Sequence, residues 1–576
     1  MAAHHFSQYL FTSLRDQGVR YCFGIPGDYI LPFFDAIEKI DGIDSIVATH
    51  EPAAAFSADA YARLNGLGVL LVTYGVGALN VMNGVACAYA ESSPVLVISG
   101  APSSRYSYHE GNPFSPMVHH TVKNPHSQIE AFGRLVEKCF RIKDKESAAN
   151  TIQEAIRCAK NNKRPVYLEV SSDLMLQEIP VSGKKKRAVP SQGHEINNAL
   201  DYFRQRIQAA ENPVLHLGVE ISRYNLQGAV KKMMASLNIP AVLTPMGKGV
   251  IAEDFPGCYG VYAGVLSHSP EMREFVERSD LVISLGALVT DVNCGVFTAD
   301  LKQDKMLIAR TGWIGDGYAN LLPAAPLAVF IEKLADHLAG VKKLPSVAPR
   351  NKGFDYASSD SIMDRFLHVI NSHLNEHTLI IADTGDSCYG SLFLQTRRDN
   401  GFMAPLFYNS MGFAVPAAVG AQLAEPGVRP LVLVGDGAFQ MTGLEISTML
   451  RYQLDPIILI FNNNGYGMQR LFQDGPFNTL GRWNYSKVTS LVNGGKSWKV
   501  SSPDELAAAL AQAGTIRNCP CIIEVIVPQG QVSTPLRIFS DAVKREKTGL
   551  CPLQITKNEP CSHFARCAYC RAAIWG

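Results

Sequence analysis

Polar residues that can bind a cation follow two apolar segments in the C-terminal third of the chain. Asp436 lies in the sequence Gly-Asp-Gly at residues 435–437, and Asn-Asn-Asn-Gly begins 26 residues after it, at Asn462. Asp436 offers a carboxylate, Asn463 an amide oxygen and Gly465 a backbone carbonyl, and such oxygen ligands suit Mg²⁺. The flanking glycines allow the backbone to approach a diphosphate closely. The spacing predicts a joint site for Mg²⁺ and a diphosphate.

A Gly-Asp-Gly sequence on its own is equally typical of a tight turn. The second polar segment, which follows another apolar run, makes a turn without a ligand the weaker interpretation. The chain has neither a Walker A loop nor a Gly-x-Gly-x-x-Gly sequence placed after a strand. The common nucleotide-binding motifs are therefore excluded.

The elements around these residues predict how they come together. Residues 429–434 and 457–461 are short apolar runs that indicate buried strands, and residues 439–451 between them have a helical pattern. A right-handed crossover makes two such strands parallel neighbours. Their carboxyl ends then lie at one edge of the sheet, where open α/β sheets bind ligands.

The same alternation of apolar runs and helical patterns occurs throughout the chain. The other runs that indicate strands are residues 69–73, 95–99, 213–218, 241–244, 281–286 and 378–382, and a helix is expected over residues 79–91. Linker-like sequences at 181–193 and 339–352 separate the groups. We expect an α/β protein with three parallel-sheet domains, at residues 1–182, 191–340 and 353–550.

Composition argues against several classes of protein. The 576 residues include 53 Lys and Arg against 52 Asp and Glu, which gives a net charge of +1. Such a balance indicates neither nucleic acid nor an anionic membrane as a partner. The longest apolar runs, such as 94–100 and 456–461, are far shorter than the ~18 residues of a membrane span. Residues 1–20 lack the apolar core of a signal peptide, so we expect a cytoplasmic protein.

The 13 cysteines are mostly scattered, which predicts reduced thiols rather than a disulfide framework. Cys567 and Cys570 have the spacing of a metal knuckle, with Cys561 and His563 nearby, but a second knuckle is absent. We expect residues 551–576 to be a poorly ordered tail rather than a zinc site. The basic run at residues 183–187 indicates a solvated linker more than a nuclear address.

The polar segments resemble those of a known family. The sequence Gly-Asp-Gly followed by Asn-Asn is similar to the thiamine diphosphate signature, in which the Asp, the second Asn and a nearby carbonyl bind the metal. Residues 24–29 (Gly-Ile-Pro-Gly-Asp-Tyr), 49–54 and 74–78 resemble motifs of pyruvate and indolepyruvate decarboxylases. Residues 119–121 (His-His-Thr) resemble the twin-histidine motif that separates these decarboxylases from acetolactate synthases. The resemblance extends to about residue 550.

The resemblance implies a thiamine diphosphate- and Mg²⁺-dependent carboxy-lyase that converts a 2-oxo acid to an aldehyde and CO₂ through a thiamine ylide. Within the family, the chain most resembles the phenylpyruvate and indolepyruvate decarboxylases. This resemblance implies an aromatic or long-chain substrate such as phenylpyruvate or indolepyruvate. Two alternatives stay open. One is a carboligase of the acetolactate synthase type, which joins the intermediate to a second carbonyl. The other is a catalytically silent thiamine-binding subunit, against which the intact Glu51, Asp436 and Asn463 argue.

The resemblance also implies roles for individual residues. Glu51 matches the carboxylate that hydrogen-bonds the cofactor's pyrimidine ring, and Asp28, His119 and His120 match an acid–base group for proton transfer. Met411 matches the bulky apolar residue that bends the cofactor. The cofactor-binding set that the family implies is Glu51, Asp386, Asn409, Met411, Gly437, Ala438, Gly465 and Met468.

The implied substrate pocket contains Cys388, Met468, Gln469 and Phe472. Pyruvate decarboxylases carry a glutamate where this chain has Gln469, and an amide cannot exchange a proton in its place. Efficient turnover of pyruvate is therefore not expected. Cys388 is small at a position where some pyruvate enzymes have a bulky aromatic residue, so we expect it to open space for a larger substrate.

The family also implies an assembly. Glu51 and the diphosphate site belong to different domains, and in the family they meet across a dimer interface. We therefore expect a homodimer as the minimal active unit and a homotetramer as the assembly. The central domain carries no dinucleotide fingerprint, so FAD is not expected there.

Overall fold

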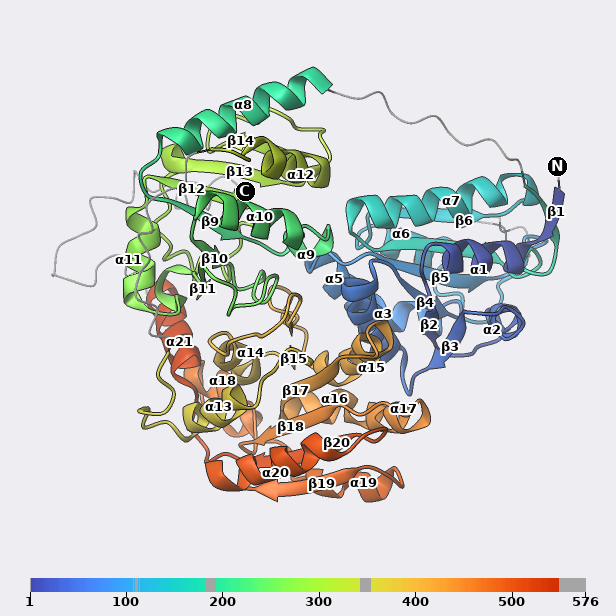
Figure 1. The fold of residues 1–576 in the computed structure, drawn as a ribbon. Helices are drawn as coiled ribbons and strands as arrows, with labels where there is room; N and C mark the ends of the chain where they lie inside the picture. Colours follow the sequence, from blue (N-terminus) through green and yellow to red (C-terminus); the bar gives the residue numbers. More distant parts are fainter. Residues whose placement is uncertain are drawn as a thin grey trace.

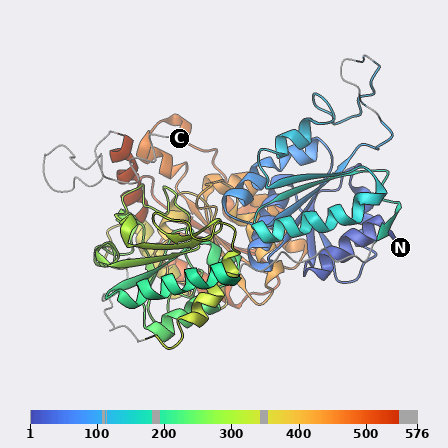
Figure 2. The same ribbon diagram turned by 90° about the horizontal axis from the view of Figure 1, so that it is seen from above.

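The computed structural model describes residues 2–106, 108, 112, 114–181, 193–341 and 354–547. Within these residues the strands form three six-stranded sheets and one two-stranded sheet. The large sheets belong to an N-terminal domain (2–181), a central domain (193–341) and a C-terminal domain (354–547). Figures 1 and 2 show the first two domains side by side, both packed against the third. The predicted fold class, three α/β domains on mainly parallel sheets, is confirmed.

The large sheet of the N-terminal domain is fully parallel, in the order β3-β2-β4-β5-β7-β6. Its strands are β2 (Tyr21–Gly24), β3 (Asp44–Val47), β4 (Gly68–Val72), β5 (Val95–Ala101), β6 (Lys138–Ile142) and β7 (Val166–Ser171). Helices α1 (Phe6–Asp16) and α7 (Lys145–Asn162) cover one face, and α3 (Glu51–Asn65) and α5 (Met82–Ala90) the other. Every residue of β4, β5 and β7 is buried, as expected for strands covered on both faces. A short antiparallel pair joins β1 (Ala2–His5) to β8 (Glu178–Val181).

The central sheet has the order β11-β10-β9-β12-β13-β14. Its strands are β9 (Pro213–Leu217), β10 (Ala241–Leu243), β11 (Cys258–Val261), β12 (Leu281–Leu285), β13 (Met306–Arg310) and β14 (Trp313–Asp316). The edge strand β14 runs antiparallel to β13, so this sheet departs from the expected fully parallel arrangement. Helices α8 (Gly193–Ala209), α10 (Gln227–Leu237) and α12 (Leu327–His337) lie on one face, and α11 (Pro270–Arg278) on the other.

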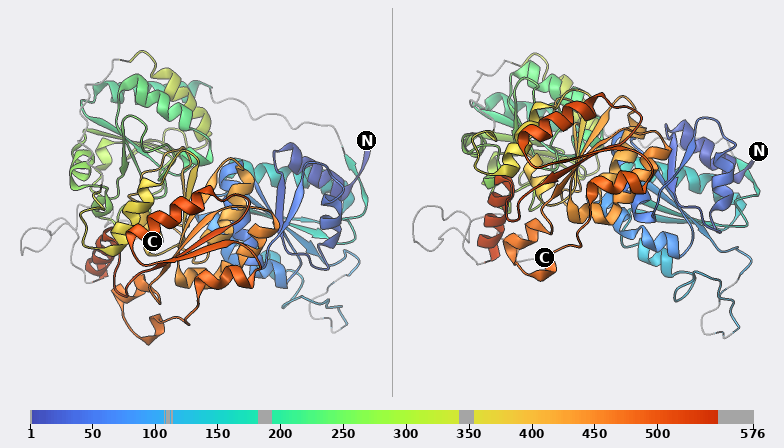
Figure 3. Two further views of the ribbon diagram at one scale, coloured as in Figure 1. Left: turned by 60° about the horizontal axis from the view of Figure 1, so that its bottom comes forward. Right: turned by 90° about the horizontal axis from the view of Figure 1, so that it is seen from below.

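The C-terminal sheet is fully parallel, in the order β16-β15-β17-β18-β20-β19. Its strands are β15 (Thr378–Ala382), β16 (Phe402–Met403), β17 (Arg429–Gly435), β18 (Ile457–Asn462), β19 (Lys496–Val500) and β20 (Cys521–Ile526). Alternate strand residues face two different cores. One core contains helices α13 (Ile362–Ser372), α20 (Pro503–Thr515) and α21 (Thr534–Lys547), and the other contains α15 (Ala414–Ala424) (Figure 3).

Two predicted helices are interrupted. In place of one helix over residues 439–451, the chain forms α16 (Asp436–Thr442), the 3₁₀ turn η3 (Gly443–Glu445) and α17 (Ile446–Arg451). A Cβ at Gly443 would lie 2.5 Å from the Phe439 ring, so the turn packs too closely there for a larger residue. The segment 79–91 is divided between α4 (Val76–Asn80) and α5.

Helices α3 and α15 join the N-terminal domain to the C-terminal domain. Both are rich in alanine, and their buried residues belong to one shared core. A Cβ at Gly420 of α15 would lie 1.9 Å from the carbonyl oxygen of Ser57 in α3, so only glycine permits this approach. The hydroxyl of Ser57 donates to the carbonyl of Pro416 at 2.8 Å. The two helices therefore share one apolar core across the interface between the domains.

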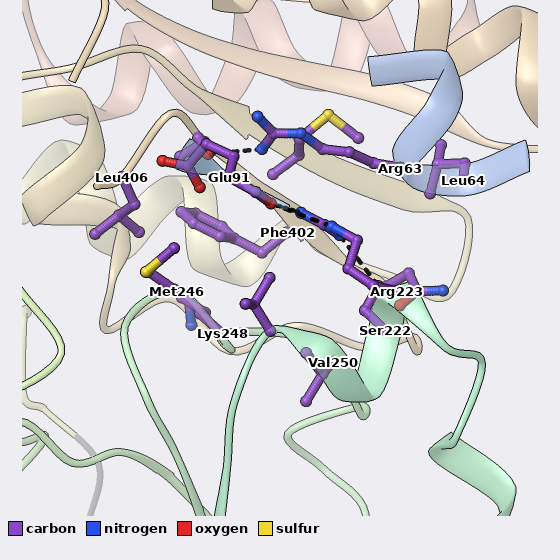
Figure 4. Close-up of a pocket in the computed structure, with 14 residues that line it drawn as sticks. Arg63, Leu64, Glu91, Ser222, Arg223, Met246, Lys248, Val250, Phe402 and Leu406 are labelled. Atoms are coloured by element: carbon purple, nitrogen blue, oxygen red, sulfur yellow. Dashed lines mark hydrogen bonds between the residues drawn. The ribbon is translucent and has the colours of Figure 1, made fainter. Parts of the chain in front are cut away.

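Two buried cations, Arg63 and Lys248, and the half-buried Arg223 mark the junction of all three domains (Figure 4). Arg63, Arg223 and Lys248 surround a cavity of about 30 Å³. Arg223 of the central domain donates to the backbone carbonyls of Glu91 and Ser92 in the N-terminal domain. Burial lowers the pKa of Arg223 to about 9, with nearby Arg63 acting in the same direction. Charged groups that are largely shielded from water thus connect the domains.

We expect Arg63→Met to destabilise the N-terminal domain by about 3–5 kcal/mol. The guanidinium binds both carboxylate oxygens of Asp59, at 2.9 and 2.8 Å, and the Asp59 side chain is 0% exposed. Removing Arg63 leaves that charge buried and unpaired. Differential scanning calorimetry should show the midpoint falling by about 2–4 °C per kcal/mol for a domain of this size.

Two controls separate this explanation from a general loss of packing. The double variant Arg63→Met/Asp59→Leu removes both charges and should recover most of the loss. Lys39→Met breaks an exposed ion pair with Asp35 and should change the midpoint little. A double variant no more stable than Arg63→Met would contradict the explanation.

Within the described residues no helix is both long enough and apolar enough to cross a membrane. The nine cysteines of this part of the chain are free thiols. The basic run at 183–187 and the tail at 551–576, with Cys567 and Cys570, lie outside the described residues, so the expectations for them stay predictions.

Candidate active site

The two polar segments meet where β17 and β18 end. These strands are parallel neighbours, with Gly435 paired to Phe461. Asp436 begins α16, is 1% exposed, and accepts hydrogen bonds from the backbone N–H groups of Gly437 at 2.8 Å and Gly465 at 3.0 Å. Burial raises the pKa of the Asp436 carboxyl to about 6, because the charged form has lost its water.

Asn463 supplies a second oxygen beside this carboxylate. Its side-chain Oδ1 is buried and has no hydrogen-bond partner among the described residues. The backbone also comes close here, because a Cβ at Gly465 would lie 2.2 Å from the carbonyl oxygen of Asn478. An unpaired buried oxygen next to a buried carboxylate is stabilised when a cation binds both. The residues therefore fit Mg²⁺ as the partner of a diphosphate.

A cavity of about 300 Å³ opens beside this oxygen set. Its lining comes from the C-terminal domain, except for Asp291 and Val292 of the central domain. It contains ten of the predicted site residues: Asp386, Asn409, Met411, Asp436, Gly437, Ala438, Asn463, Gly465, Met468 and Gln469. The structure thus brings the predicted metal ligands, most of the predicted cofactor contacts and two of the predicted pocket residues to one place.

Two predicted pocket residues lie elsewhere. Cys388 is 1% exposed and belongs to the core beneath α14 (Asp386–Ser391), and burial raises the pKa of its thiol. Phe472, in α18 (Gly467–Phe472), packs against the same core. Neither residue lines the cavity. Their contribution to substrate size stays a prediction, and in this structure the neighbouring residues form the wall.

Aromatic residues that the sequence did not single out form part of that wall. The ring of Tyr389 stacks on that of Phe539, with centroids 4.1 Å apart and an interplanar angle of 25°. Both residues line the cavity. Phe539 belongs to the C-terminal helix α21, about 150 residues along the chain, so no local pattern indicates the pair.

Asp383 holds the loop that carries Met411. Its carboxylate accepts hydrogen bonds from the backbone N–H groups of Gly412 at 3.0 Å and Ala414 at 2.8 Å. Asp383 is fully buried, and this burial raises its pKa to about 6. The position of Asp383 directly after the apolar strand 378–382 indicates a residue at the edge of a site. The sequence does not show that it binds the backbone of the loop that carries Met411.

The four predicted catalytic residues lie in the N-terminal domain. The carboxylate of Asp28 pairs with His119, accepts a hydrogen bond from the hydroxyl of Thr73 at 3.0 Å, and lies 3.8 Å from Nε2 of His120. Partial burial acts to raise the pKa of Asp28, but the hydrogen bonds from His119 and Thr73 outweigh it and hold the pKa below its ordinary value. The structure therefore assembles a carboxylate and two histidines into one group that can exchange protons.

Glu51 begins helix α3. Its carboxylate accepts a hydrogen bond from Asn80 Nδ2 at 2.8 Å and lies 3.9 Å from Nε2 of His50. The start of the helix is fixed from the C-terminal domain, because the buried carboxylate of Glu445 binds both the backbone N–H, at 2.7 Å, and the hydroxyl of Thr49. No local pattern in the sequence indicates this contact between distant residues.

The two groups of residues are separate within one chain. Asp28, Glu51, His119 and His120 are all absent from the lining of the cavity. The cavity therefore holds the oxygen ligands and apolar walls, while the residues suited to proton transfer lie on another domain. One chain alone does not bring the two halves of the predicted site together.

Comparison with known proteins identifies relatives along most of the chain. Residues 4–130 match the N-terminal TPP binding domain of thiamine pyrophosphate enzymes, residues 200–309 the central domain, and residues 383–525 the C-terminal TPP binding domain. The indole-3-pyruvate decarboxylase of Azospirillum brasilense is 35% identical over 546 residues, covering 93% of this chain and 98% of the relative. A probable pyruvate decarboxylase of Schizosaccharomyces pombe is 30% identical over 553 residues, covering 93% and 96%. The pyruvate decarboxylase of Hanseniaspora uvarum is 31% identical over 554 residues, covering 91% and 95%.

Proposed function

The chain belongs to the thiamine diphosphate-dependent 2-oxo acid decarboxylases, and we propose that it acts on 2-oxo acids with aromatic side chains at a site completed by a second copy of the chain. The family's reaction converts a 2-oxo acid anion and one proton to an aldehyde and CO₂. When bound, thiamine diphosphate supplies the nucleophilic carbon that adds to the 2-oxo group and accepts the electrons of the breaking bond. The protein supplies binding, orientation and proton transfer.

The cavity of the C-terminal domain supplies the binding. Asp436, Asn463 and the carbonyl of Gly465 would hold Mg²⁺, and Gly437 and Ala438 line the same cavity where the diphosphate would bind. Met411, whose loop is held by Asp383, would offer the cofactor an apolar contact in the cavity. The buried Asp436 beside the unpaired Asn463 oxygen is the observation that carries this assignment.

The N-terminal domain supplies the proton chemistry. Glu51 would hydrogen-bond the pyrimidine ring, and the group formed by Asp28, His119 and His120 would deliver the proton that replaces CO₂. These residues lie outside the cavity of their own chain. A homodimer in which each cavity receives the N-terminal domain of the partner would unite the two halves, and its symmetry would create two equivalent sites.

The preference for aromatic substrates rests on the wall of the cavity. Tyr389 and Phe539 present a stacked pair, and Met468 adds a flexible apolar side chain. Gln469 stands where pyruvate decarboxylases carry a glutamate. The relative from Azospirillum brasilense is named for indole-3-pyruvate, an aromatic 2-oxo acid, which also supports a preference for aromatic substrates.

We expect kcat/KM to be about 30-fold to 2 × 10³-fold higher for phenylpyruvate than for pyruvate. Burial of the ring contributes about 1.5–3 kcal/mol and its contact with the aromatic pair about 0.5–1.5 kcal/mol, and about 1.4 kcal/mol is tenfold. The comparison is made on one preparation with pyruvate, 4-methyl-2-oxopentanoate and phenylpyruvate.

The variant Phe539→Ala tests the source of that preference. It should lower kcat/KM for phenylpyruvate more than for pyruvate, so the smaller substrate is the internal control. A clear preference of the wild type for pyruvate would refute the proposal. Mass spectrometry of the products distinguishes aldehyde release from carboligation, which would give 2-hydroxy ketones.

A further inference from the structure

The segment 73–80 of the N-terminal domain binds two carboxylates that we assign to proton transfer and hydrogen bonding of the cofactor. At its start, the hydroxyl of Thr73 donates to Asp28 at 3.0 Å. At its end, which is also the end of α4, Nδ2 of Asn80 donates to Glu51 at 2.8 Å. The course of this segment therefore affects how both carboxylates are placed.

The middle of the same segment supports His120. His120 is the third residue of a turn in which the N–H of Thr121 donates to the carbonyl of Val118 at 3.2 Å, and its φ is 68°. This left-handed conformation is uncommon for residues other than glycine. Gly75, with a φ of 64°, lies directly against the turn, since a Cβ there would be 2.2 Å from the carbonyl oxygen of His120. Such a backbone conformation persists only where neighbouring groups hold it.

A buried amide holds Gly75 in this position. The backbone N–H of Gly75 donates to Oε1 of Gln128 at 2.6 Å. Gln128 belongs to α6 (Ser127–Phe132) and is 2% exposed. The chain just before α6 is fixed to the sheet, because Arg141 of β6 donates to the carbonyl of Pro125 at 3.1 Å. A buried N–H needs an acceptor, so the position of Gly75 depends on Gln128.

The surroundings of Gln128 leave one orientation for its amide. Nε2 donates to Oγ of Ser99 at 3.1 Å and to the hydroxyl oxygen of Tyr167. Both hydroxyl protons are engaged elsewhere, that of Ser99 with a backbone carbonyl at 2.8 Å and that of Tyr167 with Glu169 at 3.0 Å. These oxygens therefore accept from Gln128, and its Oε1 is turned toward Gly75.

We propose that Gln128 is a positioning residue for proton transfer, which acts through Gly75 on His120 and through α4 on Glu51. The assignment rests on the proposed function, which gives His120 and Glu51 their roles. Gln128 does not line the cavity, and Gly75 precedes the first residue of α4. Its effect is one of geometry, because a proton is transferred efficiently only between groups within hydrogen-bond reach.

Gln128→Met keeps the length of the side chain and removes its donors and its acceptor. The kcat for phenylpyruvate should fall by about 10²-fold, the cost of displacing reacting groups by about 1 Å. The dissociation constant of thiamine diphosphate, measured with Mg²⁺ present, should change far less than kcat, because the ligands of the metal lie in another domain. Gln422→Met is the matched control and should keep the kcat of the wild type, since Gln422 is a buried glutamine bonded to Asp455 in the C-terminal domain.

A measurement on the protein without cofactor separates a change of position from a general loss of packing. The ring signals of His119 and His120 can be followed by NMR with isotope-labelled histidine and assigned with His119→Gln and His120→Gln. They should shift in Gln128→Met and stay unchanged in Gln422→Met. Hydrogen exchange followed by mass spectrometry should become faster over residues 75–80 in Gln128→Met alone.

Gln128→Glu tests the amide itself. A protonated carboxyl offers one O–H and one carbonyl oxygen, so it resembles the amide. An ionised carboxylate cannot donate to Tyr167 and would face the buried Glu169, whose own charge is paired with Arg141. The kcat of this variant relative to the wild type should therefore rise as the pH falls and the carboxyl takes up a proton.

Unchanged kcat and unchanged histidine signals in Gln128→Met would overturn the assignment. An equal loss of kcat in Gln422→Met would do the same, since it marks a general effect of packing. If Gln128→Met does not fold, Gln128→Glu decides, and an activity relative to the wild type that is the same at every pH would contradict the role of the amide. Failure of the wild type to release CO₂ from any 2-oxo acid would instead overturn the proposed function, while the histidine signals would still test the position of the turn.

Discussion

Asp436→Ala should purify without thiamine diphosphate and should not regain activity when the cofactor and Mg²⁺ are added. The variant removes the carboxylate from the oxygen set and leaves Asn463 and the Gly465 carbonyl to bind the cation alone. A diphosphate facing only carbonyl oxygens is repelled unless a cation lies between them. Loss of a residue that merely supports a metal ligand already costs about 10- to 100-fold in affinity, so loss of the ligand itself should exceed this.

Calorimetric titration of the apoprotein measures this directly. Wild-type protein dialysed against EDTA should lose the cofactor and bind it again only when Mg²⁺ is restored. Asp504→Ala, which removes an exposed carboxylate at the start of α20, is the control and should bind as the wild type does. Near-normal cofactor binding by Asp436→Ala after EDTA treatment would remove Asp436 from the metal site.

The strands and the cofactor half of the site could be predicted because both depend on local sequence. An apolar run such as 378–382 coincides with β15, since a strand buried on both faces needs little more than aliphatic residues with breakers at each end. Asp436 and Asn463 are next to strand ends, so the parallel register alone brings them together.

Other features depend on contacts between distant elements, which spacing does not encode. Asp291, Phe539 and Glu445 reach their places through the packing of separate elements. The surroundings of Cys388 depend on such packing too, and its influence on substrate size stays a prediction. Ser387 and Tyr389 line the cavity, whereas Cys388 between them is buried in the core and does not line it.

Glu51→Gln should separate cofactor binding from catalysis. Glutamine keeps the shape of the side chain and can still bind Asn80, which donates to Glu51 at 2.8 Å. It cannot offer the carboxylate that the pyrimidine ring requires. Thiamine diphosphate should therefore still bind, while exchange of its C2 hydrogen with deuterium, followed by quenched NMR, should slow by about 10²-fold or more. The control is Glu130→Gln, which changes an exposed acid of the same domain and should leave the exchange of the C2 hydrogen unchanged. Asp59→Asn would not serve as a control, because Asp59 is buried.

Mixing two inactive variants then tests whether the site is shared between chains. Glu51→Gln damages the N-terminal half of a site and Asp436→Ala the C-terminal half. If each cavity receives the N-terminal domain of the partner, a mixed dimer has one site with both defects and one site with neither. Random pairing gives about half mixed dimers, so a mixture unfolded and refolded together should recover about a quarter of wild-type activity. If each chain formed its site alone, every site in the mixture would carry one defect, and no activity would return.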